Sequence, residues 1–211
     1  MPTTPKLALP YPTLSDSADV PRDIQALATK IDGITFGASL VTSLPASPAD
    51  GQECHYLADN ANGLVWHLRY RAASSSAYKW EVVGGSPLTQ QVDALVTSTS
   101  STFTALAGGP SITVPLAGDY LVGIGATTSL NASSQSTYMT YTVGAVAADN
   151  TDGINLAQPT SVIGTWASLA HTRRKNAIAA AAALVAVYAA TGGGTGSWQW
   201  RWMNVMPIRV G

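Results

Sequence analysis

Residues 197–211 read SWQWRWMNVMPIRVG, and this closing stretch decides the fold class. Side chains of a β-strand alternate between two faces with a period of two. The stretch shows that period, interrupted only at Asn204, and therefore predicts a long strand with Gln199, Arg201 and Arg209 on its polar face. Pro207 cannot donate a ladder hydrogen bond, so we expect an edge or a bulge there. The side chains expected on the buried face are Trp198, Trp200, Trp202, Met206, Ile208 and Val210.

The run before this strand, AIAAAAALVAVYAA at residues 177–190, allows two interpretations. Alanine favours helices more than any other residue, so a buried helix is one of them. The second half of the run is β-branched and aromatic, however, and TGGGTG at residues 191–196 leads into the terminal strand as a hairpin turn does. We therefore predict a strand.

Further strands are predicted upstream, on both sides of an AGD turn (117–119) within residues 111–130, at residues 135–146 and around residues 161–175. The spacing of Leu88, Val92 and Leu95 favours a short helical lead-in before them. Several strands joined by short glycine-rich turns predict an antiparallel sandwich or jelly roll over residues 88–211. The segments before and after the AGD turn would share one apolar face, made by Ile112, Val114, Leu116, Tyr120, Val122 and Ile124.

The first 87 residues are built differently. Five prolines within residues 1–21 predict an extended arm, either a flexible tail or an arm docked on a partner. A helix is predicted from the N-cap Asp19 to Gly33, with one narrow apolar stripe: Ile24, Leu27 and Ile31. So short a helix needs a partner to be stable.

Residues 40–87 predict a small β module with aromatic anchors, which are Trp66, Tyr70, Tyr78 and Trp80. The expected domains are therefore 1–39, the anchoring arm and short helix; 40–87, the β module; and 88–211, the jelly-roll head.

Composition bounds the function. Only 11% of the residues are charged, against about 25% in typical soluble domains, which favours burial of surface in an oligomer. The net charge of -1 gives no electrostatic footprint for nucleic acid. The single cysteine excludes an internal disulfide, and no run is long enough for a signal peptide core or a membrane span. We expect a soluble protein without membrane insertion.

The sequence offers little catalytic chemistry. His55, His67 and His171 are interpreted as structural or solvated, and Cys54 beside His55 is a poor metal half-site. HTRRK, residues 171–175, is interpreted as a solvated turn, or as a contact for an acidic partner surface or a phosphorylated wall polymer. No nucleophile elbow, P-loop or zinc-protease motif occurs. We predict no catalytic residues, no metal and no cofactor.

The tryptophans carry the binding hypothesis. Indoles stack on sugar rings and dominate protein interfaces. A face that stays apolar along a whole strand favours the head core or a trimer seam, made by Trp198, Trp200, Trp202, Met206 and Ile208, with ligand stacking as the alternative. Trp166, Tyr138 and Tyr141 are the candidates for a receptor surface.

Three segments also carry a resemblance. LALPYPTLSDSADVPRDIQALATKID (7–32) resembles the N-terminus of virion proteins of tailed phages that infect actinobacteria and related hosts. LPASPADGQECHYLAD (44–59), VWHLRY (65–70) and YKWEVVGGSPL (78–88) resemble a module of phage tail and fibre proteins. GPSITVPLAGDYLVGIGA (109–126) and GGGTGSWQWRWMNVMPIRVG (192–211) resemble the jelly-roll head of trimeric phage fibres, which is similar in shape to C1q and TNF heads.

The resemblance implies a non-enzymatic homotrimer on the virion surface, made in the host cytoplasm. Residues 1–33 would anchor it to capsid or tail proteins as a compact fibre, spike or decoration knob. The head would contact host-surface glycan or stabilise the particle. The alternatives are a phage depolymerase acting on host polysaccharide and a stand-alone lectin-like module.

Overall fold

The structure is a computed structural model, and it describes residues 3, 9–11, 19–32, 39–158 and 163–211. The chain divides into two compact units, residues 1–39 and 40–211. Most of the predicted arm lies outside the described residues.

The first unit contains the predicted helix. Helix α1 spans Val20–Asp32. The Asp19 carboxylate caps it by accepting a hydrogen bond of 3.1 Å from the backbone N–H of Arg22, which satisfies one of the free donors at a helix start. The apolar stripe is largely uncovered, since Ile24 is 61% and Ile31 39% exposed and Leu27 is half-buried. The helix is thus confirmed, and its apolar stripe faces water in the single chain.

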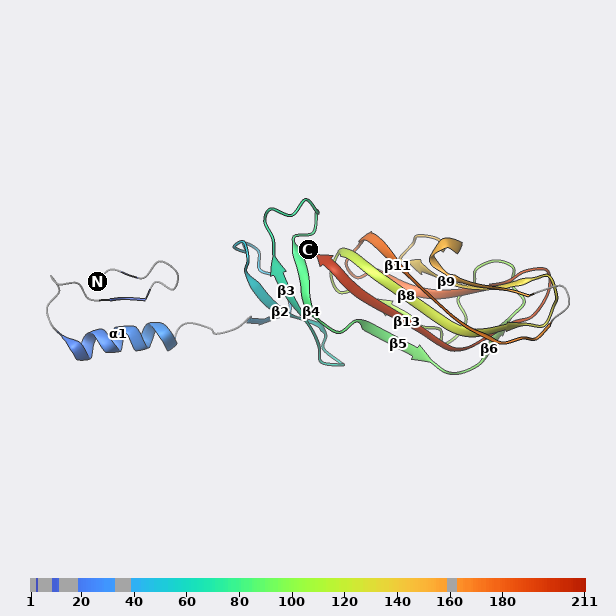
Figure 1. Cartoon of the computed structure of the whole chain (residues 1–211), viewed down its shortest axis with the longest axis horizontal. Coiled ribbons are helices and arrows are strands. Elements are labelled where there is room, and N and C mark those ends of the chain that lie inside the picture. Colours follow the sequence, from blue (N-terminus) through green and yellow to red (C-terminus); the bar gives the residue numbers. More distant parts are fainter. Residues whose placement is uncertain (1–2, 4–8, 12–18, 33–38, 159–162) are drawn as a thin grey trace. The chain divides into compact units, whose positions relative to one another are not determined.

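The second unit is an antiparallel β-sandwich with one short 3₁₀ helix in its described part, η1 (Asn150–Asp152). Figure 1 labels the main strands. The described strands are β1 (Ser39–Val41), β2 (Glu53–Asp59), β3 (Leu64–Tyr70), β4 (Trp80–Gly85), β5 (Leu88–Val92), β6 (Val96–Ser98), β7 (Ser111–Thr113), β8 (Gly118–Leu130), β9 (Ser136–Val143), β10 (Ile154–Ala157), β11 (Ala167–Ile178), β12 (Ala183–Ala190) and β13 (Gly196–Val210).

Strand β13, the stretch quoted at the outset, organises the larger sheet. Over the described residues this sheet has nine strands in the order β1-β2-β3-β4-β13-β8-β11, with β5 and β6 also paired to β13. One edge of β13 pairs along its length with β8, and the other edge pairs in turn with β6, β5 and β4. The smaller described sheet has four strands in the order β10-β9-β12-β7.

The expected module at 40–87 is continuous with the head. Strand β4 pairs with the end of β13, where Trp80 faces Val210, so β2, β3 and β4 extend the larger sheet. Residues 40–87 and 88–211 therefore lie in the same compact unit, and the structure shows no division at residue 87. Two of the predicted module anchors, Trp66 and Trp80, are buried.

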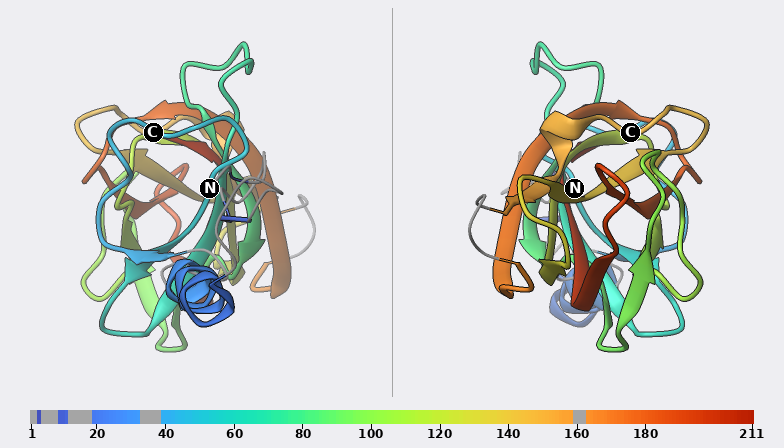
Figure 2. Two further views of the ribbon diagram at one scale, coloured as in Figure 1. Left: turned by 90° about the vertical axis from the view of Figure 1, so that its left-hand side faces the viewer. Right: turned by 90° about the vertical axis from the view of Figure 1, so that its right-hand side faces the viewer.

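The interior between the sheets holds one large apolar cluster. Figure 2 views the ribbon from its two ends and shows strands on either side of this interior. The predicted apolar face of residues 111–124 is confirmed, because Ile112, Val114, Tyr120, Val122 and Ile124 are all buried. Leu116 is partly buried and packs against the cluster.

Three local expectations are wrong. Leu88–Val92 forms strand β5 rather than a helical lead-in, since its backbone pairs with Arg201–Val205 of β13. The alanine run ends in a strand, β12, as predicted, but the turn after it joins the two sheets and closes no hairpin. Residues 171–175 lie within β11 and form no turn.

Glu81 ties three strands of the larger sheet together. Its carboxylate accepts a hydrogen bond of 2.6 Å from Arg69 Nε on β3. It also lies 3.4 Å from Arg71 Nε and 3.5 Å from Arg209 Nη2 on β13. The hydrogen bond from Arg69, supported by the charges of the three arginines, lowers the pKa of Glu81 below its usual value.

This lowered pKa predicts a loss of stability in acid. The folded chain binds fewer protons at Glu81 than the unfolded chain does, so the contribution is complete above the unfolded pKa of about 4.3 and falls away as the pH drops through the lower folded pKa. We expect Glu81→Gln to lose less unfolding free energy between neutral pH and about pH 3 than the original chain does. Urea unfolding at fixed protein concentration measures this free energy at both pH values. An equal loss in the two proteins would contradict the role of Glu81.

Candidate functional site

A bulge at Trp200 divides strand β13 into two registers. The backbone of Trp200 has a φ of +51°, which a bulky residue adopts only at a cost. The pairing with β8 shifts between Gln199 and Trp202. Before the bulge an even-numbered residue, Trp198, faces the core, and after it the odd-numbered Arg201, Met203 and Val205 do so.

The predicted continuous apolar face of the strand is therefore wrong. Trp198 is in the core, but Trp200 is 54% exposed. Trp202, Met206 and Ile208 are half-buried on the outer face of the sheet. A second register shift follows Pro207, where a bulge was one of the two expectations, and Val210 is buried again.

Trp198 and Trp66 are the two largest fully buried side chains in the described part of the chain. The Trp198 side chain has no exposed surface, and its ring meets the ring of Tyr188 edge-on, with 5.2 Å between centroids. A Cβ atom on Gly196 would lie 2.5 Å from the Trp198 ring, so glycine is required beneath it.

Arg201 is buried although the sequence placed it on the polar face. It has no exposed surface, and its Nη1 donates to the Tyr188 hydroxyl at 3.3 Å. Its Nη2 donates to the Ala94 carbonyl at 3.2 Å, and the guanidinium lies 5.6 Å from the centroid of the Tyr188 ring. No carboxylate in the described part of the chain pairs with it. The register shift, which sequence reasoning missed, accounts for this placement.

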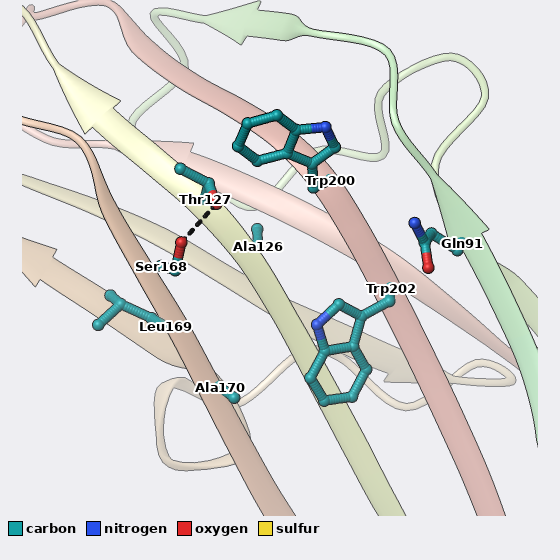
Figure 3. A pocket seen from close by; sticks show the side chains of 8 residues that line it. All are labelled: Gln91, Ala126, Thr127, Ser168, Leu169, Ala170, Trp200 and Trp202. Atoms are coloured by element: carbon teal, nitrogen blue, oxygen red, sulfur yellow. Dashed lines mark hydrogen bonds between the residues drawn. The ribbon is translucent and has the colours of Figure 1, made fainter.

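The two outer indoles line a shallow groove, which we call the tryptophan groove (Figure 3). Its volume is about 300 Å³. Trp200 and Trp202 come from β13, Gln91 comes from β5, and Thr127 and Ser168 come from β8 and β11. The residues that line the groove are Gln91, Ala126, Thr127, Ser168, Leu169, Ala170, Trp200 and Trp202.

Two glycines of β8, Gly123 and Gly125, leave room for the indole of Trp202 to lie flat against the sheet. A Cβ atom on Gly125 would lie 2.5 Å from the Trp202 ring, and one on Gly123 would lie 3.3 Å from it. The indole therefore lies where these two residues lack side chains. It forms a fixed aromatic surface.

The groove is polar at one side but carries no charge. The Thr127 and Ser168 hydroxyls are 2.7 Å apart, and Gln91 Nε2 donates to Asp93 at 2.7 Å. None of the residues lining the groove is ionisable in the neutral range. Such a surface has the means to pack against another protein or to stack on a sugar ring, and it contains no acid–base pair.

The three candidates for a receptor surface do not form one surface. Trp166 is 45% exposed. Tyr138 is half-buried and touches Phe103, whereas Tyr141 is 1% exposed. Their spacing on β9 places the two tyrosines on opposite faces. Tyr141 is therefore not part of an exposed receptor surface, and that expectation is corrected.

The histidines and the cysteine are held within strands. His67 Nε2 lies 2.9 Å from the Glu53 carboxylate, and its ring is 4.9 Å from that of His55. Burial raises the pKa of the Cys54 thiol. Over the residues that the structure describes, no three His, Cys, Asp or Glu side chains come together as a metal site.

The fold and the groove define a class: a mainly β antiparallel protein of jelly-roll type with an uncharged aromatic surface. No protein-family profile matches the sequence, and no curated protein matches it either. Among the helices described, none is long and apolar enough to cross a membrane.

Several solved structures align with part of this chain. The Eiger TNF of S. frugiperda aligns over 60% of this chain and 95% of its own, with 11% identity and a TM-score of 0.43. The VP2 subviral particle of infectious bursal disease virus aligns over 79% of this chain but 41% of its own, with 12% identity and a TM-score of 0.35. A carbohydrate-binding module from Cellvibrio mixtus lichenase 5A aligns over 59% and 99%, with 17% identity and a TM-score of 0.31.

Proposed function

We propose that this chain is a non-enzymatic structural protein of a phage virion: a homotrimeric surface fibre, spike or decoration protein. Residues 1–33 anchor it to capsid or tail proteins, and the head faces outward for host-surface adhesion or particle stabilisation. The observation that carries the proposal is the tryptophan groove, because it presents fixed, uncharged aromatic surface without catalytic groups.

The outer face of the larger sheet supports self-association. Trp200 is 54% and Leu121 41% exposed there, and Trp202, Met206 and Ile208 are half-buried beside them. Aromatic and aliphatic side chains with few charges are typical of the centre of a protein interface. We place the trimer seam on this face.

The helix α1 supports the same conclusion independently. Its apolar stripe consists of Ile24, Leu27 and Ile31. Within one chain Ile24 and Ile31 are exposed and Leu27 is half-buried. Copies arranged around one symmetry axis bury such stripes against each other. The number of copies, three, rests on the resemblance of the sequence to trimeric fibre heads.

The proposed helix contact predicts the behaviour of a paired set of variants. Ile24→Asp with Ile31→Asp places two charges in the stripe and is expected to weaken the trimer at least tenfold, since burying an unpaired charge is costly. Gln25→Asp with Thr29→Asp adds the same charge at exposed positions of the helix and serves as the control. Sedimentation velocity of the full chains measures the difference. Equal association of the two variants would remove the helix from the interface.

The virion assignment is tested on purified particles of the phage that encodes the chain. An antibody against residues 88–211 is expected to label the particle surface, and a chain lacking residues 1–33 is expected to be missing from particles. Unchanged incorporation of the shortened chain would contradict anchoring by the arm.

The depolymerase alternative needs two carboxylates held across a cleft. The residues lining the tryptophan groove include no acid. Incubation of host polysaccharide with the chain, followed by measurement of new reducing ends, distinguishes the two functions.

A further inference from the structure

The guanidinium of Arg201 lies in the core without an opposite charge in the described part of the chain. Arginine is almost never fully buried unless it is paired, because taking a cation out of water is costly. Two hydrogen bonds offset part of this cost, one to the Tyr188 hydroxyl and one to the Ala94 carbonyl. The Nε atom has no partner among the described residues. Stability of the core alone therefore does not explain why an arginine stands at this position.

The terminal strand has an alternative register that would avoid this cost. A slip of one residue in the pairing of a strand turns its side chains to the opposite face. In the alternative register the pairing of Trp198 with Thr128 would continue along β13 without the bulge. Trp200 and Trp202 would then enter the core, and Arg201 would face water. Burial of two indoles and exposure of a cation agree with the hydrophobic pattern of the sequence, so specific contacts have to favour the observed register.

Tyr188 of β12 contacts β13 on both sides of the bulge. The Trp198 ring meets the Tyr188 ring at 5.2 Å between centroids, and the Arg201 guanidinium lies 5.6 Å from the Tyr188 centroid. Positions 198 and 201 are three apart, so in a regular strand they would face opposite sides of the sheet. Both side chains reach Tyr188 because the bulge adds one residue between them. The contacts between Arg201 and Tyr188 therefore belong to the observed register alone.

The other edge of β13 is irregular at the same point. β13 pairs with β6 up to Trp198 and with β5 from Arg201 onward. Between these points the residues 93–95 of the neighbouring segment lie opposite only 199 and 200 of β13. Arg201 Nη2 donates to the carbonyl of Ala94, in the middle of that segment. One guanidinium therefore connects the bulge both to the segment beside it and, through Tyr188, to the smaller sheet.

We propose that Arg201 is a positioning residue for the tryptophan groove. Its hydrogen bonds and its contact with Tyr188 select the bulged register, and this register turns Trp200 and Trp202 outward into the groove (Figure 3). A buried polar group can fix the register of packed elements at a cost in stability. The use of the groove in a trimer rests on the proposed function, whereas the choice of register does not.

The test compares the full original chain with Arg201→Met, which has a side chain of similar length without the charge and the donors. Nuclear Overhauser contacts between backbone protons report the register. Ile124 pairs with Met203 in the observed register and would pair with Trp202 in the alternative one. In Arg201→Met the contact between Ile124 and Trp202 is expected to appear in about a tenth of the molecules or more, and in the original chain it is expected to be absent.

Two further variants and a stability measurement complete the test. Arg201→Lys restores a cation that donates hydrogen bonds and is expected to restore the observed register. Arg209→Met removes an arginine farther along the same strand and serves as the matched control, with the register unchanged. Arg201→Met is expected to unfold at a urea concentration equal to or above that of the original chain, because an apolar residue of similar volume in place of a buried charge is often neutral or stabilising.

Three results would overturn the proposal. The first is an unchanged single register in Arg201→Met, and the second is the same alternative register in Arg209→Met. The third is an Arg201→Met chain that no longer folds, which would make Arg201 a residue required for core stability. The register is measured within one chain and does not depend on association. Loss of the trimer in a chain that keeps the observed register would contradict the proposed function and leave the role of Arg201 intact.

Discussion

Trp198→Ala is expected to destabilise the head severely, whereas Trp200→Ala, two residues away, is expected to leave it folded and dissociate the trimer. Trp198 is fully buried against Tyr188, and truncating such a core tryptophan costs about 3–5 kcal/mol of unfolding free energy. Trp200 is 54% exposed, so its removal takes little from the core of one chain. Thermal unfolding followed by circular dichroism, together with sedimentation velocity, separates the two effects.

The pair tests the bulge at Trp200 directly. An unbroken period of two would place both indoles on the same face and give the two variants the same phenotype. Equal loss of stability in Trp198→Ala and Trp200→Ala would therefore contradict the register shift between Gln199 and Trp202. Gln199→Ala, in the same strand and half-buried, is the control and is expected to change neither property strongly.

Gly125→Ala is expected to displace the Trp202 indole and to abolish self-association through the outer face. The new Cβ atom would lie 2.5 Å from the ring, closer than atoms approach, so the indole has to leave the sheet. Overpacking of this kind costs about 1–3 kcal/mol, and here it also removes the fixed aromatic surface. Tryptophan fluorescence and sedimentation of the purified chain measure the displacement and the loss of trimer.

A graded series of glycines provides the controls for Gly125. At Gly123 the nearest atoms to an added Cβ lie 3.2 and 3.3 Å away, so Gly123→Ala is expected to have a smaller effect of the same kind. At Gly84 the nearest atom lies 3.6 Å away, an ordinary contact, so Gly84→Ala is expected to be neutral. A trimer that survives Gly125→Ala unchanged would show that Trp202 lies outside the seam.

The sequence predicted where the strands and the helix lie better than it predicted which of their side chains face the core. The terminal strand follows from its alternation, and the helix from Asp19 and its spaced apolar residues. The bulge could not be predicted, because tryptophan does not favour a positive φ. One signal was visible: Asn204 interrupts the even-numbered face where Met203 and Val205 supply an odd-numbered one, and these two are buried.

The errors elsewhere have a common physical cause. Leu88, Val92 and Leu95 share helical spacing, but the segment is a strand because β13, more than a hundred residues later, offers it an edge to pair with. Tyr141 was a candidate for a receptor surface, but the packing of the two sheets buries it in the apolar cluster, and nothing in the sequence around it indicates that burial.

The central claim is that the outer indoles of the larger sheet are covered by further copies of the same chain. Sedimentation equilibrium of the full chain at low concentration, with acrylamide quenching of tryptophan in the same samples, measures this most directly. The account predicts a mass of three times 21.8 kDa, 65.4 kDa, and fluorescence protected from the quencher that becomes accessible on dissociation. A stable species of 21.8 kDa whose Trp200 is quenched freely would contradict it.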